Sequence, residues 1–193
     1  MVNLILFGPP GAGKGTQSAK LIEKYSLTHI STGDLFRKHL KEGTPLGKLA
    51  QDYMSKGNLV PDQLVIDMVD DKIKNSGDIN GIIFDGFPRT TPQAEALDAL
   101  LESKQSPIKI LIELVVPEDE LKIRLAERAI KENRPDDAKP EVILNRIAVY
   151  KAETVSVGQY YQDRGKYASV NGVGDIDQIF SNLCREIDKS LLL

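Results

Sequence analysis

The sequence predicts an α/β fold in which a doubly wound, parallel five-stranded sheet carries helices on both faces. Short apolar segments alternate with longer amphipathic segments along most of the 193 residues. Several short segments, such as residues 2–7 and 108–116, are too continuously apolar to have one wet face. Because parallel strands are joined by helical crossovers, this alternation indicates strands that helices cover on both sides. The length suits a single domain with a substantial core.

The predicted elements follow one another in alternating order. Strands are expected at residues 2–7, 28–31, 82–85, 108–116 and 167–170. Helices are expected at residues 14–25, 32–42, 46–56, 61–75, 91–103, 117–131, 140–164 and 175–191. In the last helix, apolar side chains repeat at helical spacing from Ile176 to Leu191, and Asp175 or an adjacent residue can cap the N-terminus. Ligands of such sheets bind at the carboxyl ends of the strands, so we expect the site residues there.

A glycine-rich segment follows the first strand: Gly8-Pro9-Pro10-Gly11-Ala12-Gly13-Lys14-Gly15-Thr16. Small residues let backbone N–H groups surround a polyphosphate, and the next helix directs its N-terminal amides and positive dipole end to the same place. Lys14 adds a mobile positive charge. The segment therefore predicts a P-loop that binds a nucleoside triphosphate, although Gly15 stands where Ser or Thr usually follows the lysine.

Two segments interrupt the alternation. Residues 31–60 hold two helical stretches with no strand between them, which predicts a small helical insertion. Residues 131–140 are polar and contain two prolines, a composition that alone is typical of a solvated loop. Four arginines lie in or near this loop in the sequence: Arg134 is within it, Arg124 and Arg128 precede it, and Arg146 follows it. A single surface arginine often only pairs with a nearby glutamate, but a group of guanidiniums can bind phosphate oxygens through paired N–H groups.

The third strand ends in Phe84-Asp85-Gly86-Phe87-Pro88-Arg89. A carboxylate at the end of a buried strand beside a P-loop is well placed to hold Mg²⁺ through its water ligands. Gly86 allows a ligand to approach the backbone, and Arg89 can bind a second phosphate. Taken alone, these residues are also compatible with an ordinary turn at the end of a strand.

Composition excludes several other classes of protein. The net charge of −3 offers no basic surface for nucleic acid. Cys184 is the single cysteine, so neither an intramolecular disulfide nor a cysteine-based zinc site is expected. No apolar run approaches the ~18 residues of a membrane-spanning helix, and the N-terminus lacks the features of a signal peptide. The expected location is the cytoplasm, with no membrane partner.

Five motifs together resemble the adenylate kinases, members of the nucleoside monophosphate kinase family, in their short-lid form. They are GPPGAGKGTQ at 8–17, STGDLFR at 31–37, GNLVPD at 57–62, DGFPRT at 85–90 and the arginine series at 124–146. The unusual Gly15 is itself a feature of the resemblance, because these kinases carry GxPGxGKGT. The resemblance implies reversible transfer from MgATP to AMP that yields two ADP, by a monomer that needs no zinc.

The same resemblance implies a division of the chain and a role for each site residue. One P-loop kinase domain spans 1–193, with a core at 1–30, 61–127 and 139–193, an insertion at 31–60 that binds the monophosphate, and a short lid at 128–138. The ATP-binding residues are expected to be Gly11, Ala12, Gly13, Lys14, Gly15, Thr16, Arg128 and Gly174. The AMP-binding residues are expected to be Thr32, Arg37, Gly57, Asn58, Leu59, Val60, Gly86, Phe87, Pro88, Arg89, Gln93, Arg134 and Arg146.

The implied catalytic residues are Lys14, Asp85, Arg89, Arg124, Arg128, Arg134 and Arg146, with Asp85 ordering the waters of Mg²⁺ and with Asp136 and Asp137 helping to lock the lid. The nucleophile in such a reaction is a phosphate oxygen that is already anionic, so no general base is required. What remains is to hold two anions in line and to neutralise charge on the transferred group.

Two alternatives stay open at this stage. A UMP/CMP kinase shares the fold, P-loop and arginines, but adenylate kinases resemble this chain in carrying Thr32 and Gln93, where pyrimidine kinases tend to carry alanine and asparagine. A P-loop switch that binds nucleotide without transferring phosphate would need a guanine-reading NKxD segment, and the sequence contains none.

Overall fold

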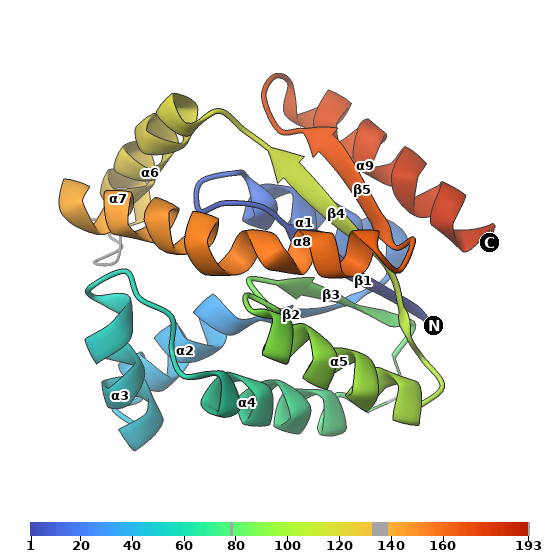
Figure 1. The fold of residues 1–193 in the computed structure, drawn as a ribbon, viewed down its shortest axis with the longest axis horizontal. Helices are drawn as coiled ribbons and strands as arrows, with labels where there is room; N and C mark the ends of the chain where they lie inside the picture. Colours follow the sequence, from blue (N-terminus) through green and yellow to red (C-terminus); the bar gives the residue numbers. More distant parts are fainter. Residues whose placement is uncertain (78, 133–138, 193) are drawn as a thin grey trace.

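A parallel five-stranded sheet forms the centre of the computed structural model, which describes residues 1–77, 79–132 and 139–192 (Figure 1). The strand order is β2-β3-β1-β4-β5, and each neighbouring pair is parallel. The strands are β1 (Val2–Phe7), β2 (Thr28–Ser31), β3 (Gly81–Asp85), β4 (Ile108–Val115) and β5 (Tyr167–Asn171). The sheet extends to both sides of the central strand β1, and this confirms the predicted doubly wound fold class.

Helices cover both faces of this sheet. Within the described residues they are α1 (Lys14–Tyr25), α2 (Thr32–Lys41), α3 (Pro45–Met54), α4 (Asp62–Lys74), α5 (Thr91–Ser103), α6 (Glu118–Glu132), α7 (Pro140–Val149), α8 (Val155–Gln162) and α9 (Ile176–Leu191). The Asp175 carboxylate caps α9 by accepting from the backbone N–H groups of Asp177 and Gln178 at 3.0 and 2.9 Å, which confirms the predicted cap. None of the helices in the described part of the chain is long and apolar enough to cross a membrane.

The side chains of β1 divide between two hydrophobic cores. Leu4 and Leu6 pack in the core that includes residues of α1 and α9, whereas Ile5 and Phe7 pack in the core that includes residues of α4, α5 and α8. All four side chains are buried. A strand whose successive side chains all need apolar partners is stable only between two helical layers, and this explains the continuous apolar run in the sequence.

Asn3 is a polar residue near the start of this apolar strand. Its side-chain amide donates to the carbonyl of Ser106 at 2.6 Å, and its carbonyl oxygen accepts from the backbone N–H of Ile82 at 3.0 Å. The side chain is fully buried, so these bonds replace the water that it loses. The register between β1 and β4 shifts at this residue.

The interruption at residues 31–60 consists of α2 and α3. Ser31 caps α2 by accepting from the N–H of Asp34, and Thr44 caps α3 by accepting from the N–H of Gly47 at 3.1 Å. A Cβ on Gly47 would overlap the backbone carbonyl of His39, so glycine lets the two helices approach closely. In Figure 1, α2 and α3 lie on one side of the carboxyl edge of the sheet, and α6 and α7 lie on the other.

The long helix predicted at 140–164 is interrupted by a π-helical turn at Tyr150–Thr154. At this turn the Tyr150 hydroxyl donates to the Glu113 carboxylate of β4 at 2.9 Å, and its ring contacts Phe7 with centroids 5.7 Å apart. The extra residue of a π turn re-aims side chains, and such turns recur at functional sites. Of the predicted lid, residues 133–138 lie outside the described residues, and with them Arg134, Asp136 and Asp137.

Candidate active site

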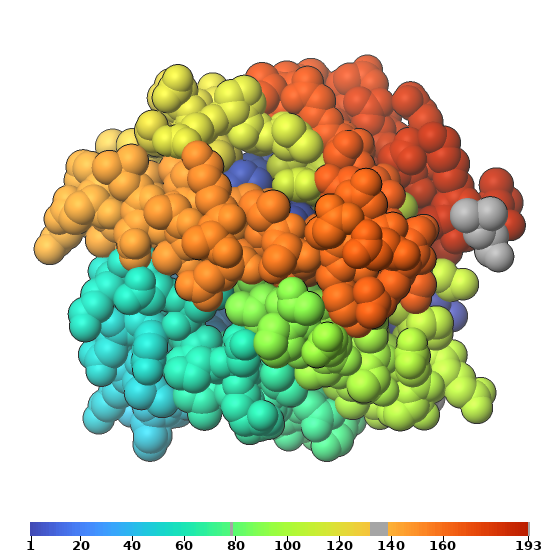
Figure 2. Space-filling model, in the orientation of Figure 1, coloured from blue at the N-terminus to red at the C-terminus, as the bar shows by residue number. Residues whose placement is uncertain are grey.

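A cavity of about 920 Å³ opens at the carboxyl edge of the sheet. In Figure 2 it is visible as a hollow between α6 and the α7–α8 segment, with N-terminal residues at its base. The site residues predicted from sequence that the structure describes all line this cavity, whereas Arg134, Asp136 and Asp137 lie outside the described residues. Segments far apart in the chain therefore meet at one place. This agrees with the expectation that ligands of such sheets bind at the carboxyl ends of the strands.

The P-loop forms the floor of the cavity between β1 and α1. Gly8 and Gly11 have φ angles of 137° and 87°, a region that other residues rarely adopt. A Cβ on Gly8 would lie 2.8 Å from the carbonyl oxygen of Leu114, and one on Gly11 would lie 3.0 Å from the Leu125 side chain. These glycines are therefore needed for packing against β4 and α6 as well as for an open loop.

Lys14 lies in the P-loop with its ammonium group over the loop backbone. Its Nζ donates to the carbonyls of Gly8 and Pro9 at 2.8 and 3.0 Å. Burial lowers the pKa of Lys14 from its ordinary value of 10.5 to about 8, against the opposing effect of the Asp85 charge. The positive charges of Arg89, Arg128 and Arg146 contribute to this lowering of the pKa. These three guanidiniums thus act on the same point, where a bound polyanion would relieve their mutual repulsion.

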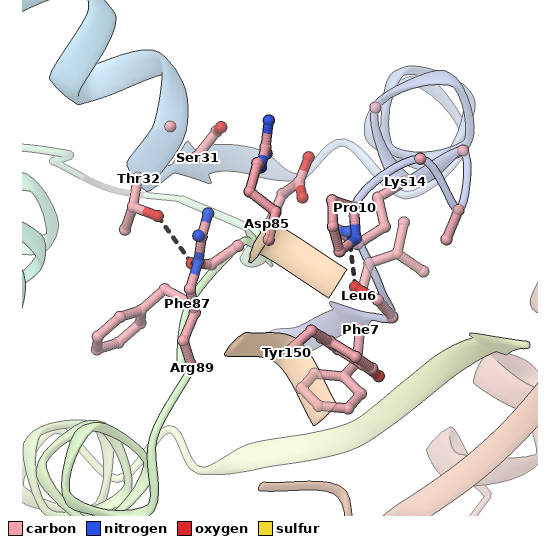
Figure 3. A pocket seen from close by; sticks show the side chains of 18 of the residues that line it. Leu6, Phe7, Pro10, Lys14, Ser31, Thr32, Asp85, Phe87, Arg89 and Tyr150 are labelled. Atoms are coloured by element: carbon pink, nitrogen blue, oxygen red, sulfur yellow. Dashed lines mark hydrogen bonds between the residues drawn. The ribbon is translucent and has the colours of Figure 1, made fainter. Parts of the chain in front are cut away.

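Asp85 ends β3 and lies between Lys14 and Arg89 in Figure 3. Its side chain is 14% exposed, and His29 Nε2 is 3.7 Å from Oδ2. Burial by itself raises the pKa of the carboxyl group, but His29, Lys14 and Arg89 together hold that pKa below its ordinary value. The carboxylate is therefore ionised near neutral pH, and it fits the donor set of a hydrated Mg²⁺ ion.

The backbone after Asp85 links β3 to the start of α2. The carbonyl of Gly86 accepts from the Thr32 hydroxyl at 2.8 Å and from Arg89 Nε at 2.7 Å. The backbone N–H of Arg89 donates to Gln93 Oε1 at 2.8 Å. On α2, Arg37 forms an ion pair with Asp34. The bonds to Gly86 and Gln93 fix the direction of the Arg89 side chain at the cavity wall.

Residues 56–58 pack directly against α7. Asn145 Nδ2 donates to the carbonyl of Lys56 at 2.7 Å and to Asn58 Oδ1 at 2.9 Å. A Cβ on Gly57 would lie 2.9 Å from Cγ of Arg146. The return of the insertion, with Gly57 to Val60, therefore lies beside the arginine-bearing helix.

Arg124 lies at another part of the cavity wall. Its Nε donates to Glu120 at 2.7 Å, and its Nη1 donates to the carbonyl of Gly172 at 3.1 Å. These bonds direct the guanidinium toward the loop that holds Gly174. Arg124 thus borders the segment that holds Gly174, which was predicted to bind ATP.

Sequence reasoning missed several residues that line the cavity, among them Gln17 and Tyr150. Gln17 is buried, and its Nε2 donates to the carbonyl of Ile176 at 3.0 Å, which joins α1 to the start of α9. A signal for Gln17 existed, because a buried polar side chain directly after the P-loop needs a partner. No comparable signal marked Tyr150, whose place depends on the π turn.

A phosphate-binding loop that faces converging arginines across the carboxyl edge of a parallel sheet defines a nucleotide-dependent phosphotransferase of the P-loop class. The family model described as "Adenylate kinase" matches residues 6–166. The chain belongs to the adenylate kinase family, as its motifs predicted, and it is an enzyme of the ATP:AMP phosphotransferase type.

Curated relatives match nearly the whole chain. It is similar to an adenylate kinase of Bacteroides fragilis, with 45% identity over 97% of this chain and 99% of the relative. An adenylate kinase of Flavobacterium psychrophilum is also 45% identical, with the same coverage. An adenylate kinase of Methanothrix thermoacetophila is 39% identical over 97% of this chain and 99% of the relative.

Proposed function

We propose that the cavity binds MgATP and AMP together and transfers the γ-phosphoryl group in line between them. The observation that carries this proposal is electrostatic. The charges of Arg89, Arg128 and Arg146 all lower the pKa of the P-loop lysine, Lys14, although these residues come from separate segments. Such a concentration of positive charge is suited to two polyphosphates that would otherwise repel each other.

Within this proposal, the donor and acceptor nucleotides occupy different parts of the cavity. The P-loop holds the ATP phosphates through backbone N–H groups and Lys14, and Arg128 reaches them from α6. Thr32, Arg37, Arg89 and Gln93, with the backbone at 57–60 and 86–88, hold AMP. Arg124, Arg134 and Arg146 complete the ring of charge. Because the attacking group is a phosphate oxygen, the site needs alignment and charge neutralisation rather than a general base.

Adenylate kinases in general use MgATP, and we propose that Asp85 holds the ion here through its water ligands. The ionised, largely buried carboxylate beside Lys14 supports this role. When bound, Mg²⁺ neutralises charge on the phosphate oxygens of ATP. Asp85 would accept hydrogen bonds from the water ligands of the ion and would thereby help to hold it.

We also propose that residues 31–60 and 128–138 move as two covers of the site. Their closure would exclude water, which otherwise competes with AMP for the γ-phosphoryl group. The contact between Asn145 and residues 56–58 supports this idea, because it joins the insertion to the helix that follows the lid.

The choice of AMP rather than a pyrimidine monophosphate is tested with purified protein. The protein is incubated with MgATP and AMP, UMP or CMP, and the diphosphate products are measured. We expect efficient formation of ADP with AMP and little product with the other two. Product with UMP or CMP but not with AMP would identify a pyrimidine kinase, and no transfer to any of the three would overturn the proposal.

Arg89→Ala is expected to lower kcat/KM for AMP by about 10²-fold or more, because it removes a positive charge that acts beside the transferred group. Arg164→Ala is the matched control, since this exposed arginine stacks on Tyr160 outside the cavity, with its guanidinium carbon 3.5 Å from the ring centroid. Steady-state kinetics with varied AMP measure both variants. Wild-type kinetics in a folded Arg89→Ala protein would remove Arg89 from the site.

We expect the purified protein to contain no stoichiometric zinc. The short lid at 128–138 holds no cysteine and is too short for a sheet of its own. Elemental analysis of the protein measures the metal content directly, and one zinc per chain would contradict this expectation. Light scattering on the same sample tests the expected monomer.

A further inference from the structure

A carboxylate that none of the roles above uses lies directly behind the AMP side of the cavity. Asp62 is the first residue of α4 and follows the return of the insertion at 57–60. Its Oδ1 accepts from Gln93 Nε2 at 2.7 Å, and its Oδ2 accepts from the Thr90 hydroxyl at 2.9 Å. Gln93 lines the cavity, whereas Asp62 is set behind it. Asp62 therefore acts on the cavity through Gln93.

The Gln93 side chain is held at both ends of its amide. Asp62 accepts from the nitrogen, and the backbone N–H of Arg89 donates to the oxygen at 2.8 Å. A carboxylate can only accept and a backbone N–H can only donate, so a flipped amide would face like groups at both ends. The side chain is 1% exposed, and water cannot compensate for the lost bonds. The network thus permits a single orientation.

Thr90 completes the network and ties two helices together. Its hydroxyl oxygen caps α5 by accepting from the N–H of Gln93 at 3.3 Å while its proton goes to Asp62. One carboxylate therefore joins the N-terminus of α4 to that of α5, where the positive ends of both helix dipoles favour its charge.

We propose that Asp62 is a positioning residue that sets acceptor-base specificity by locking the Gln93 amide. This inference rests on the proposed function, in which Gln93 is one of the residues that hold AMP, and it adds that the Gln93 amide contacts the base. Adenine presents an amino donor at C6, whereas a 6-oxopurine presents an acceptor at the same position. An amide that cannot flip accepts from the first and leaves the second without a donor. The lock therefore favours AMP over IMP.

Asp62→Asn tests the proposal because it keeps the size of the side chain while adding a donor. The new side-chain amide can present either its oxygen or its nitrogen to Gln93, so the Gln93 amide is free to take both orientations. We expect the ratio of kcat/KM for AMP to that for IMP to fall about tenfold. In the variant, a flipped Gln93 amide can donate to the 6-oxo group of IMP, so this acceptor is no longer left without a partner. The KM for ATP should not change.

Asp67→Asn is the matched control on the same helix. Asp67 is exposed and also accepts from a glutamine amide, Gln63 Nε2, at 2.7 Å, but it lies away from the cavity. The Asp67→Asn variant should keep the wild-type ratio of kcat/KM for AMP to that for IMP. In a Gln93→Leu background, Asp62→Asn should have no further effect on that ratio, because the group it acts through is gone.

An unchanged AMP:IMP ratio in folded Asp62→Asn, as judged by its thermal melt, would overturn the inference. Should that variant not fold, Thr90→Val removes the second anchor of the carboxylate, and it should shift the ratio in the same direction; no shift would again count against the lock. Failure of the proposed function is distinguishable, because the wild-type protein would then not phosphorylate AMP at all.

Discussion

Lys14→Met is expected to lower kcat/KM for phosphoryl transfer by about 10³-fold, because it removes the one mobile charge of the P-loop that can follow the transferred group. Methionine has a similar length and no charge, so the substitution preserves the packing of this side chain in the loop. Lys24→Met is the control and should keep full activity, because Lys24 lies on the exposed face of α1, the helix that begins at Lys14. The measurement is initial rate of ADP formation at saturating AMP with varied MgATP. Activity within a few-fold of wild type would contradict the role given to Lys14.

The same substitution should stabilise the protein in the absence of nucleotide. The pKa of Lys14 is about 8 in the folded protein and 10.5 ordinarily, so its charge disfavours folding. That cost is fully present below about pH 8. It is lost as the pH rises from about 8 to 10.5, because in this interval the unfolded chain still binds the proton that the folded protein has released, and stability therefore rises with pH. Lys14→Met should therefore melt at a higher temperature than wild type at pH 7. A lower melting temperature at pH 7 would contradict this reasoning.

The main part of the fold was predictable because its signals are local. The apolar run at Val2–Phe7 needs a core on each face, and the structure supplies both. The Asp175 cap also follows from neighbouring residues alone. The π turn at Tyr150–Thr154 was not predictable, because it depends on contacts with Glu113 and Phe7, which lie far away in the sequence. Local periodicity cannot report a tertiary contact of this kind.

The candidate site followed the same division. Its residues sit in contiguous motifs at strand ends, so their gathering in one cavity could be expected from topology. The hydrogen bonds that hold these residues in place could not be predicted. Asp62 belongs to the GNLVPD motif at 57–62, yet its bonds to Thr90 and Gln93 cross about thirty positions of chain and depend on how α4 packs beside α5. The roles of the individual arginines stay predictions.

Gly81→Ala is expected to destabilise the protein by about 3 kcal/mol or more, although Gly81 lies outside the cavity. Gly81 is the first residue of β3 and pairs with Val2 of β1. A Cβ at this position would overlap the backbone carbonyl oxygen of Val2, and a backbone atom in a central strand cannot move aside as a side chain can. The strands would have to separate at the start of their ladder. Urea denaturation measures the change in the free energy of unfolding.

Gly158→Ala provides the opposite case in the same protein. Gly158 lies inside α8, and its Cβ would make ordinary contacts, 3.5 Å from Tyr167 and 3.7 Å from Phe7. Alanine favours a helix interior over glycine by about 1 kcal/mol, so this variant should be as stable as wild type or more stable. If Gly81→Ala unfolded at the same urea concentration as Gly158→Ala, the close approach of β1 and β3 would not be what requires glycine. Because both residues are buried glycines, the comparison separates contact with a rigid backbone from burial itself.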